Sequence, residues 1–213
     1  MNEILLNLVV FAVMALVAGI ILLVVLRKQQ QSDQQLQQFV QQNGWQYEPS
    51  RGRLEKGFRI TAAGWTLEGI SRSSDTDANA GSSNMEQKTT WTSPQPGTTI
   101  LVGPQTAQVN LGAMGEMLQL QVIHAALGGD AAGVQQVQVG SPAFQKRYMV
   151  WAQSAEQADR LLTPGVQSAL LNWTKVAPLI KRTSAGMTIE LKGVHLKKTE
   201  EILNLVRLGE SLL

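Results

Sequence analysis

The chain has 213 residues, with 18 lysines and arginines against 16 aspartates and glutamates, a formal net charge of +2, and no cysteine. A chain of this length buries a sizeable core, and the lack of cysteine excludes disulfides, cysteine nucleophiles and thiolate metal sites. Because the charges nearly cancel and the basic residues do not cluster, the composition argues against nucleic acid as a partner.

The first feature along the chain is an apolar run over residues 4–26, in which Asn7 is the only strongly polar side chain. A bilayer-spanning helix needs about 20 apolar residues, and this run has 23. A cleaved signal peptide would begin with basic residues and carry a shorter apolar core, whereas this chain begins Met1-Asn2-Glu3. We therefore expect residues 1–28 to be an uncleaved transmembrane anchor that contacts lipid through residues 4–26.

The charges beside this run indicate its orientation. Glu3 lies before the run, whereas Arg27 and Lys28 follow it, so the positive-inside rule places the C-terminal part of the chain in the cytoplasm. Within the run, Ala15 and Gly19 have a small-xxx-small spacing that lets two helices approach, although small residues are common in membrane spans. A homo-oligomer is thus left open beside a plain lipid-facing helix.

Residues 29–44 are rich in glutamine, and their large apolar residues Leu36, Phe39 and Val40 have the spacing of one helical face. We expect a helical stalk that ends at the closing glycine of this segment. One apolar turn is too short to sustain a coiled coil. The three side chains are therefore expected to dock on the domain that follows, residues 45–213.

Residues 45–104 change to a period of two, which is typical of half-buried strands. Ala63-Gly64 is a candidate turn between two alternating segments, and the small, polar residues 73–84 are typical of a loop. The expected strands are 58–62, 65–71, 87–92 and 98–102. Consecutive strands of this kind predict an antiparallel meander.

Residues 111–127 return to helical spacing, with Met114, Met117 and Leu118 recurring on one side before Gly128-Gly129 ends the run. We expect a helix whose apolar side covers the sheet. A face that contains methionine also suits an adaptable binding surface, so that alternative stays open.

The remaining residues alternate strands with short helices. Ser154 begins an S-x-x-Q capping box, and Thr163-Pro164 places a capping threonine before a first-turn proline. The expected strands are 134–139, 146–152, 179–182 and 187–192, and the last helix is 197–213. These elements predict an α+β fold, with an N-terminal transmembrane helix and then a mostly antiparallel sheet covered by helices.

Few residues suggest chemistry. His124 and His195 lack partners at a metal-ligand spacing, and the chain has no P-loop, dinucleotide-binding turn or nucleophile elbow. Asp75 and Asp77 form a D-x-D pattern, but the glycine and glutamate of a calcium-binding loop do not follow. We therefore expect no catalytic, cofactor-binding or metal-binding residues.

Five tryptophans are spread over the expected elements, and they are Trp45, Trp65, Trp91, Trp151 and Trp173. Large aromatic side chains usually anchor a core, and a buried indole needs a partner for its N–H. We expect core anchors, with a ligand groove as the alternative.

One stretch of the sequence carries more information than its hydrophobic pattern. Residues 142–152 read PAFQKRYMVWA, residues 158–164 read ADRLLTP, and Leu170-Leu171 follow. This block resembles a bacterial family of single-span membrane proteins of unknown function, whose members read F-x-(K/R)-(K/R)-(F/Y)-x-V and then A-x-x-L-L-T-P. The resemblance implies a membrane-associated α+β module in the bacterial inner membrane, and it brings no catalytic or binding residues to transfer.

These observations favour a non-enzymatic, membrane-tethered domain at the cytoplasmic face, which acts through protein contacts or by placing a sheet surface near the bilayer. The alternative is a lipid- or small-ligand-binding module with a pocket between the sheet and the 111–127 helix, for which a large apolar cavity is the expected sign. An unrecognised hydrolase would instead need convergent polar groups in a cleft.

Overall fold

The computed structural model describes residues 2–52, 55–73, 85–105, 121 and 123–213, with some side chains of the first helix and first strand outside that description. Within these residues, nine strands form one sheet in the order β1-β2-β3-β4-β9-β8-β5-β7-β6. The strands are β1 (Gln46–Arg51), β2 (Glu55–Ala62), β3 (Trp65–Ser73), β4 (Met85–Ser93), β5 (Ile100–Pro104), β6 (Gln135–Val137), β7 (Tyr148–Ala152), β8 (Leu179–Thr183) and β9 (Gly186–Lys192). All neighbouring strands are antiparallel, so the predicted α+β class and antiparallel sheet are confirmed.

The helices belong to three regions of the chain. They are α1 (Asn2–Gln42), then α3 (Pro142–Arg147), α4 (Ala155–Leu161) and α5 (Pro164–Leu171), and finally α6 (Thr199–Ser211). Residues 121 and 123–127 are also helical and lead into the 3-10 turn η1 (Gly128–Ala131). Residues 111–120 of the helix expected over 111–127 lie outside the described residues, as do residues 74–84 of the expected polar loop.

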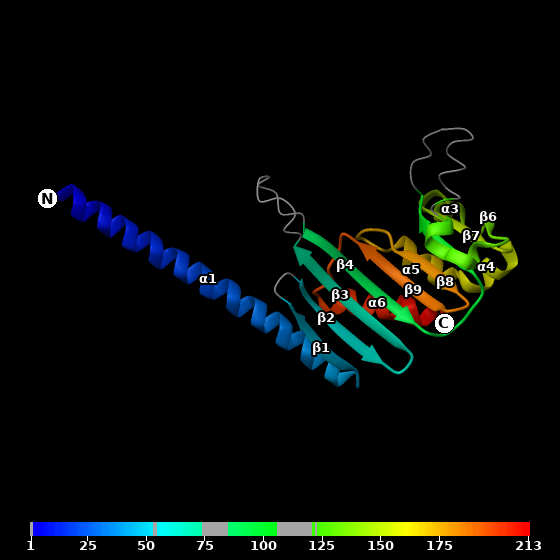
Figure 1. The fold of residues 1–213 in the computed structure, drawn as a ribbon, viewed down its shortest axis with the longest axis horizontal. Coiled ribbons are helices and arrows are strands. Elements are labelled where there is room, and N and C mark those ends of the chain that lie inside the picture. Colours follow the sequence, from blue (N-terminus) through cyan, green and yellow to red (C-terminus); the bar gives the residue numbers. More distant parts are fainter. Residues whose placement is uncertain (1, 53–54, 74–84, 106–120, 122) are drawn as a thin grey trace.

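Helix α1 is one continuous helix that runs out from the side of the sheet (Figure 1). It ends where expected, because Gly44 adopts a φ of +71° and its N–H donates to the carbonyl of Gln41. Leu36 and Val40 are buried in the core, as predicted for the stalk. No helix made of described residues has the length and hydrophobicity that a membrane span requires.

Strands β2, β3 and β4 pair in the expected order, and Ala63-Gly64 makes the turn between β2 and β3, with Gly64 at a φ of +95°. Strand β1, which the sequence did not predict, pairs with β2 at the edge of the sheet. The sequence predicted that the meander continues into β5, but in the structure it stops at β4. The hairpin of β8 and β9 inserts between β4 and β5, so that β4 pairs with β9 and β5 pairs with β8 and β7. The expected strand 98–102 also starts later, at Ile100, and includes Pro104.

The expected strand 146–152 is shorter than predicted, because residues 142–147 are the helix α3. Ser141 caps this helix by accepting a hydrogen bond from the Phe144 N–H at 3.2 Å, and Pro142 occupies its first turn. The predicted caps of α4 and α5 are confirmed, since Ser154 accepts from the Gln157 N–H and Thr163 accepts from the Val166 N–H. The final hairpin and α6 also lie where the sequence placed them.

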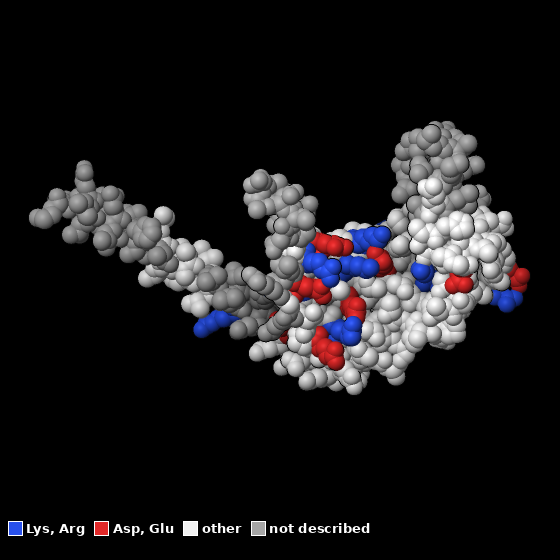
Figure 2. Space-filling view, in the orientation of Figure 1, with Lys and Arg blue, Asp and Glu red and all other residues white. Residues whose placement is uncertain are grey.

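The two faces of the sheet differ. One face carries the main core under α5, α6, the end of α1 and the helices α3 and α4. The other face is covered only near β5 and β7 among the described residues, where Ile123 and Leu127 pack on Leu101, Met149 and Trp151. Over β2, β3, β4 and β9 this second face carries paired charges, which form a mixed blue and red field in Figure 2.

Candidate functional site

An unusual surface of the described chain is the apolar part of α1. Seven large apolar side chains there are between 48% and 64% exposed, namely Met14, Leu16, Val17, Ile20, Ile21, Leu23 and Val24. At 100° per residue these positions extend around half of the helix circumference. Contiguous exposed apolar surface of this kind marks a site of contact with a membrane or another protein.

A chain of aromatic rings fixes the other end of α1 to the sheet. The ring centroids of Phe39 and Trp45 are 5.8 Å apart, those of Trp45 and Trp65 are 5.0 Å apart, and those of Trp65 and Trp91 are 6.3 Å apart. The Trp65 indole N–H also donates to Glu210 Oε1 of α6 at 3.3 Å. The C-terminal end of α1 is therefore packed into the domain.

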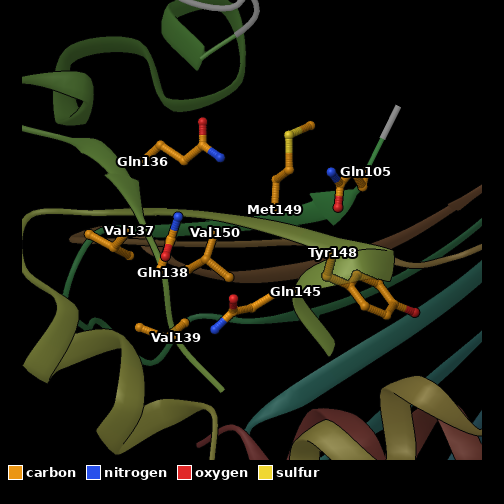
Figure 3. Close-up of a pocket in the computed structure, with 9 residues that line it drawn as sticks. All are labelled: Gln105, Gln136, Val137, Gln138, Val139, Gln145, Tyr148, Met149 and Val150. Atoms are coloured by element: carbon orange, nitrogen blue, oxygen red, sulfur yellow. The ribbon is translucent and has the colours of Figure 1, made fainter. Parts of the chain in front are cut away.

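A cleft of about 160 Å³ lies where the chain leaves β6 and separates from β7. Four glutamines and five other residues line it: Gln105, Gln136, Val137, Gln138, Val139, Gln145, Tyr148, Met149 and Val150. Figure 3 shows Gln136 and Met149 on one side of β7, with Gln145 and Val139 on the other. The cleft therefore wraps around the end of the sheet rather than lying over one face.

The groups that line this cleft are almost all neutral amides and aliphatic chains. Tyr148 turns its hydroxyl away, donating to the buried carbonyl of Leu170 at 3.0 Å, and burial raises the pKa of Tyr148. The Gln145 amide donates to the Gly140 carbonyl at 3.0 Å. The cleft thus offers hydrogen bonds to a neutral, polar group, and none of the described side chains that line it is charged.

The structure places the two histidines on different elements. His124 is exposed on the helical segment 123–127. His195 is half-buried between β9 and α6, with its ring 5.6 Å from that of Phe58, and burial together with nearby Lys197 lowers the pKa of His195. Among the described residues, no group of three or more histidine, aspartate or glutamate side chains is placed to hold a metal ion.

The other residues that the sequence singled out have mostly structural positions. Trp65, Trp91 and Trp151 are buried, and Trp45 and Trp173 are half-buried beside the main core, so the prediction of core anchors is confirmed. Asp75, Asp77 and the side chain of Ala15 lie outside the described residues, whereas Gly19 is exposed. The glutamine cleft itself was missed, and the only signal for it in the sequence is the abundance of glutamine.

No family model, curated protein or solved structure compared with this chain matches it. The resemblance of residues 142–171 to a family of single-span membrane proteins therefore stays a prediction. Three features of the structure therefore bear on function: the exposed side of α1, its joint with the sheet and the glutamine cleft.

Proposed function

We propose that this chain is a single-span, membrane-tethered module without enzymatic activity, which binds a protein partner at the cytoplasmic face of a bacterial inner membrane. The observation that carries the proposal is the exposed apolar surface of α1. Residues 4–26 are apolar on nearly every side of such a helix in sequence, and a helix of this kind fits lipid better than a single protein partner, which would cover one side.

The sequence extends this argument to the whole run of residues 4–26, because the side chains of residues 4–13, 15, 22, 25 and 26 lie outside the described part. Twenty-three residues with one strongly polar side chain suit a bilayer core. Arg27 and Lys28 then fall at one surface of the membrane, which favours the cytoplasm for the domain.

The tether is tested by flotation of membranes that contain the full chain. Replacing Ile20→Lys and Ile21→Lys puts two charges into the middle of the run, each costing about 3 kcal/mol at the centre of a membrane helix. We expect this variant to leave the floating fraction. A matched variant, Gln34→Lys with Gln38→Lys, adds the same charge to exposed positions of the stalk and should float with the parent chain. Flotation of both variants alike would contradict the tether.

The orientation is tested separately. Since the chain has no cysteine, Ala63→Cys in the exposed turn between β2 and β3 provides one reactive thiol. A membrane-impermeant thiol reagent should label this position in inverted vesicles and not in intact, right-side-out ones. Labelling in the opposite preparation would place the domain outside the cytoplasm.

The support for a protein partner is the cleft beside β6, which is the last strand of the sheet within the described residues. An edge strand presents main-chain N–H and C=O groups, to which an extended peptide adds as a further strand. The exposed amides of Gln136 and Gln138 would supply further neutral hydrogen bonds to such a peptide.

A photoreactive residue in place of Gln136 should form a discrete crosslinked species in membranes, and the same residue in place of Ala63 should not. Diffuse labelling from both positions would contradict the partner while leaving the tether intact. The alternative of a ligand-binding module has less support, because about 160 Å³ is well below the roughly 300–1,000 Å³ of ordinary small-molecule pockets.

A further inference from the structure

We propose that one end of the sheet rests on the headgroups of the membrane that holds α1, through exposed Met85 and the lysines Lys56, Lys197 and Lys198. This inference rests on the tether proposed above. The partner is a lipid surface that contains anionic phospholipid. The surface, here called the membrane-proximal end, comprises the start of β2, the end of β3, the start of β4 and the segment 192–198.

The strands of the sheet run along the axis of α1 (Figure 1). Helix α1 contacts both β1 and α6, and β1 runs back along α1 directly after the turn at Gly44. Figure 1 shows α1 running in nearly the same direction as the strands, with the tips of β3 and β9 on the side from which the N-terminal part of α1 departs. The strands therefore stand along the axis of the anchor, with one end toward the membrane and the other away from it.

The stalk part of α1 and the strand β3 have similar lengths. Sixteen steps of α1 separate Gln42 from Leu26, about 24 Å at 1.5 Å per residue. Strand β3 starts at Trp65, which contacts Trp45 just beyond the end of α1, and its eight steps to Ser73 span about 26 Å. The two segments have almost the same length, so the end of β3 lies level with Leu26, the last residue of the apolar run.

Helix α6 runs back from the end of the sheet near Trp65 toward the membrane-proximal end. Glu210 accepts the hydrogen bond from Trp65, and the twelve steps back to Lys198 span about 18 Å. The segment before α6 is held at the level of Thr89, because Thr89 Oγ1 accepts from the Leu196 N–H at 3.0 Å and donates to the Val194 carbonyl at 2.8 Å. Gly193 donates to the Gln87 carbonyl at 2.7 Å, which ties this segment to the start of β4. The start of α6 thus faces the same end of the domain as the tips of β3 and β4, with Leu196 about 13 Å behind the level of Met85.

The side chains at this end suit a headgroup layer. Met85 is 59% exposed, although it is a large apolar residue at the tip of a strand. Lys56, Lys197 and Lys198 are exposed, and each has no carboxylate partner within the described residues. Basic side chains next to a membrane span attract anionic lipid, and a thioether inserts readily among headgroups.

Of the four carboxylates described near this end, two form ion pairs. Glu55 pairs with Arg72 at 2.6 Å, and Glu190 pairs with Lys88 at 3.1 Å and Lys192 at 3.8 Å. Two further carboxylates, Glu86 and Glu200, are exposed. Arg27 adds an exposed positive charge at the same level on α1. Among the described residues, the unpaired charge near this end is therefore mainly positive.

The test uses the full chain in vesicles and two single-cysteine variants, Met85→Cys at the membrane-proximal end and Ala63→Cys at the opposite end. Each carries a fluorophore, and an acceptor dye on the lipid headgroups quenches it with distance. We expect strong quenching at position 85 and weak quenching at position 63, because β3 separates them by about 26 Å. Vesicles of phosphatidylcholine alone are compared with vesicles that also contain phosphatidylglycerol.

Charge is tested in the same labelled chain. Replacing Lys197→Gln and Lys198→Gln should lower the ratio of docked to undocked molecules on the anionic vesicles by roughly fivefold per lysine. Lys146→Gln with Arg160→Gln removes the same charge from α3 and α4 and should leave the ratio of docked to undocked molecules unchanged.

Each result decides one part of the inference. If the full chain does not float with vesicles, both the tether and the contact are overturned. If it floats but positions 63 and 85 are quenched equally, the contact alone is overturned. If position 85 is quenched equally on neutral and anionic vesicles, the proposed recognition of anionic lipid is overturned.

Discussion

The indole of Trp91 lies against the backbone of Gly209, so closely that a Cβ at position 209 would stand 2.4 Å from Cε2 of the ring. Trp91 is fully buried in the middle of β4, and Gly209 lies in α6. The close approach seats α6 on the sheet and places Glu210 beside Trp65. A missing side chain on α6 thus makes room for the largest side chain of the core.

The substitution Gly209→Ala should destabilise the domain. The added methyl group meets a ring held on all sides, and overpacking of this kind lowers the free energy of unfolding by about 1–3 kcal/mol. Urea denaturation of the full chain in detergent measures the change. Gly165→Ala is the matched control, because its Cβ meets only Thr163 Oγ1 at 3.9 Å and alanine favours a helix by up to about 1 kcal/mol. Equal stability of the two variants would contradict the packing of α6 on Trp91.

A second prediction concerns Arg147, whose guanidinium donates to the carbonyl of Leu171, the last residue of α5, and to that of Trp173 just beyond it. Arg147→Gln leaves these acceptors unpaired in a part-buried site, and we expect a loss of about 2–4 kcal/mol in the free energy of unfolding. Arg147→Lys should lie in between, since an ammonium group lacks the planar fork that serves two carbonyls at once.

The control for this prediction is an arginine at the surface. Arg160 pairs with Glu156 at 2.6 Å, but the two side chains are 77% and 76% exposed. Arg160→Gln should therefore cost no more than about 0.5 kcal/mol. A loss as large as that of Arg147→Gln would show that charge alone, rather than the two carbonyl bonds, accounts for the effect.

The joint between α1 and the domain gives a third prediction. Leu36 is 4% exposed and belongs to the main core, so Leu36→Ala should lower the free energy of unfolding by about 2–4 kcal/mol through the cavity it leaves. It should also broaden the distance distribution between spin labels on α1 and β3. Gln37→Ala, at an exposed neighbouring position, should change neither quantity. A narrow distribution in Leu36→Ala would show that the aromatic rings alone hold the joint.

Local features of the fold were predictable from the sequence because each depends on a few adjacent residues. Gly44 ends α1, Gly64 makes a turn at positive φ, and Ser154 and Thr163 cap their helices through hydrogen bonds over three residues. In the capping box, only one half forms, because Gln157 Oε1 has no hydrogen-bond partner in the described structure. The pattern thus located the helix but not the full cap.

Strand order was not predictable in the same way. The side chains of Trp91 and Ile189 face the core on neighbouring strands, and so do those of Val102 and Ile180. Alternation shows that each strand has a buried side, but it does not show which strand lies beside it. The insertion of β8 and β9 between β4 and β5 is therefore a long-range result. The cleft is equally long-range, since Gln105 follows β5 and Gln136 lies in β6.

The last prediction concerns pH and His195. Burial, with a smaller effect of Lys197, lowers the pKa of this histidine below its ordinary value of about 6.5. Below about pH 6.5 the unfolded chain binds a proton at this histidine more readily than the folded chain does. The contribution of His195 to the free energy of unfolding is therefore full above about pH 6.5 and falls as the pH drops toward the folded pKa. Urea denaturation between about pH 8 and pH 5 should show the loss, and His195→Gln should remove it. His124→Gln changes an exposed position and should retain the slope of the parent chain. Persistence of the slope in His195→Gln would assign it to another group.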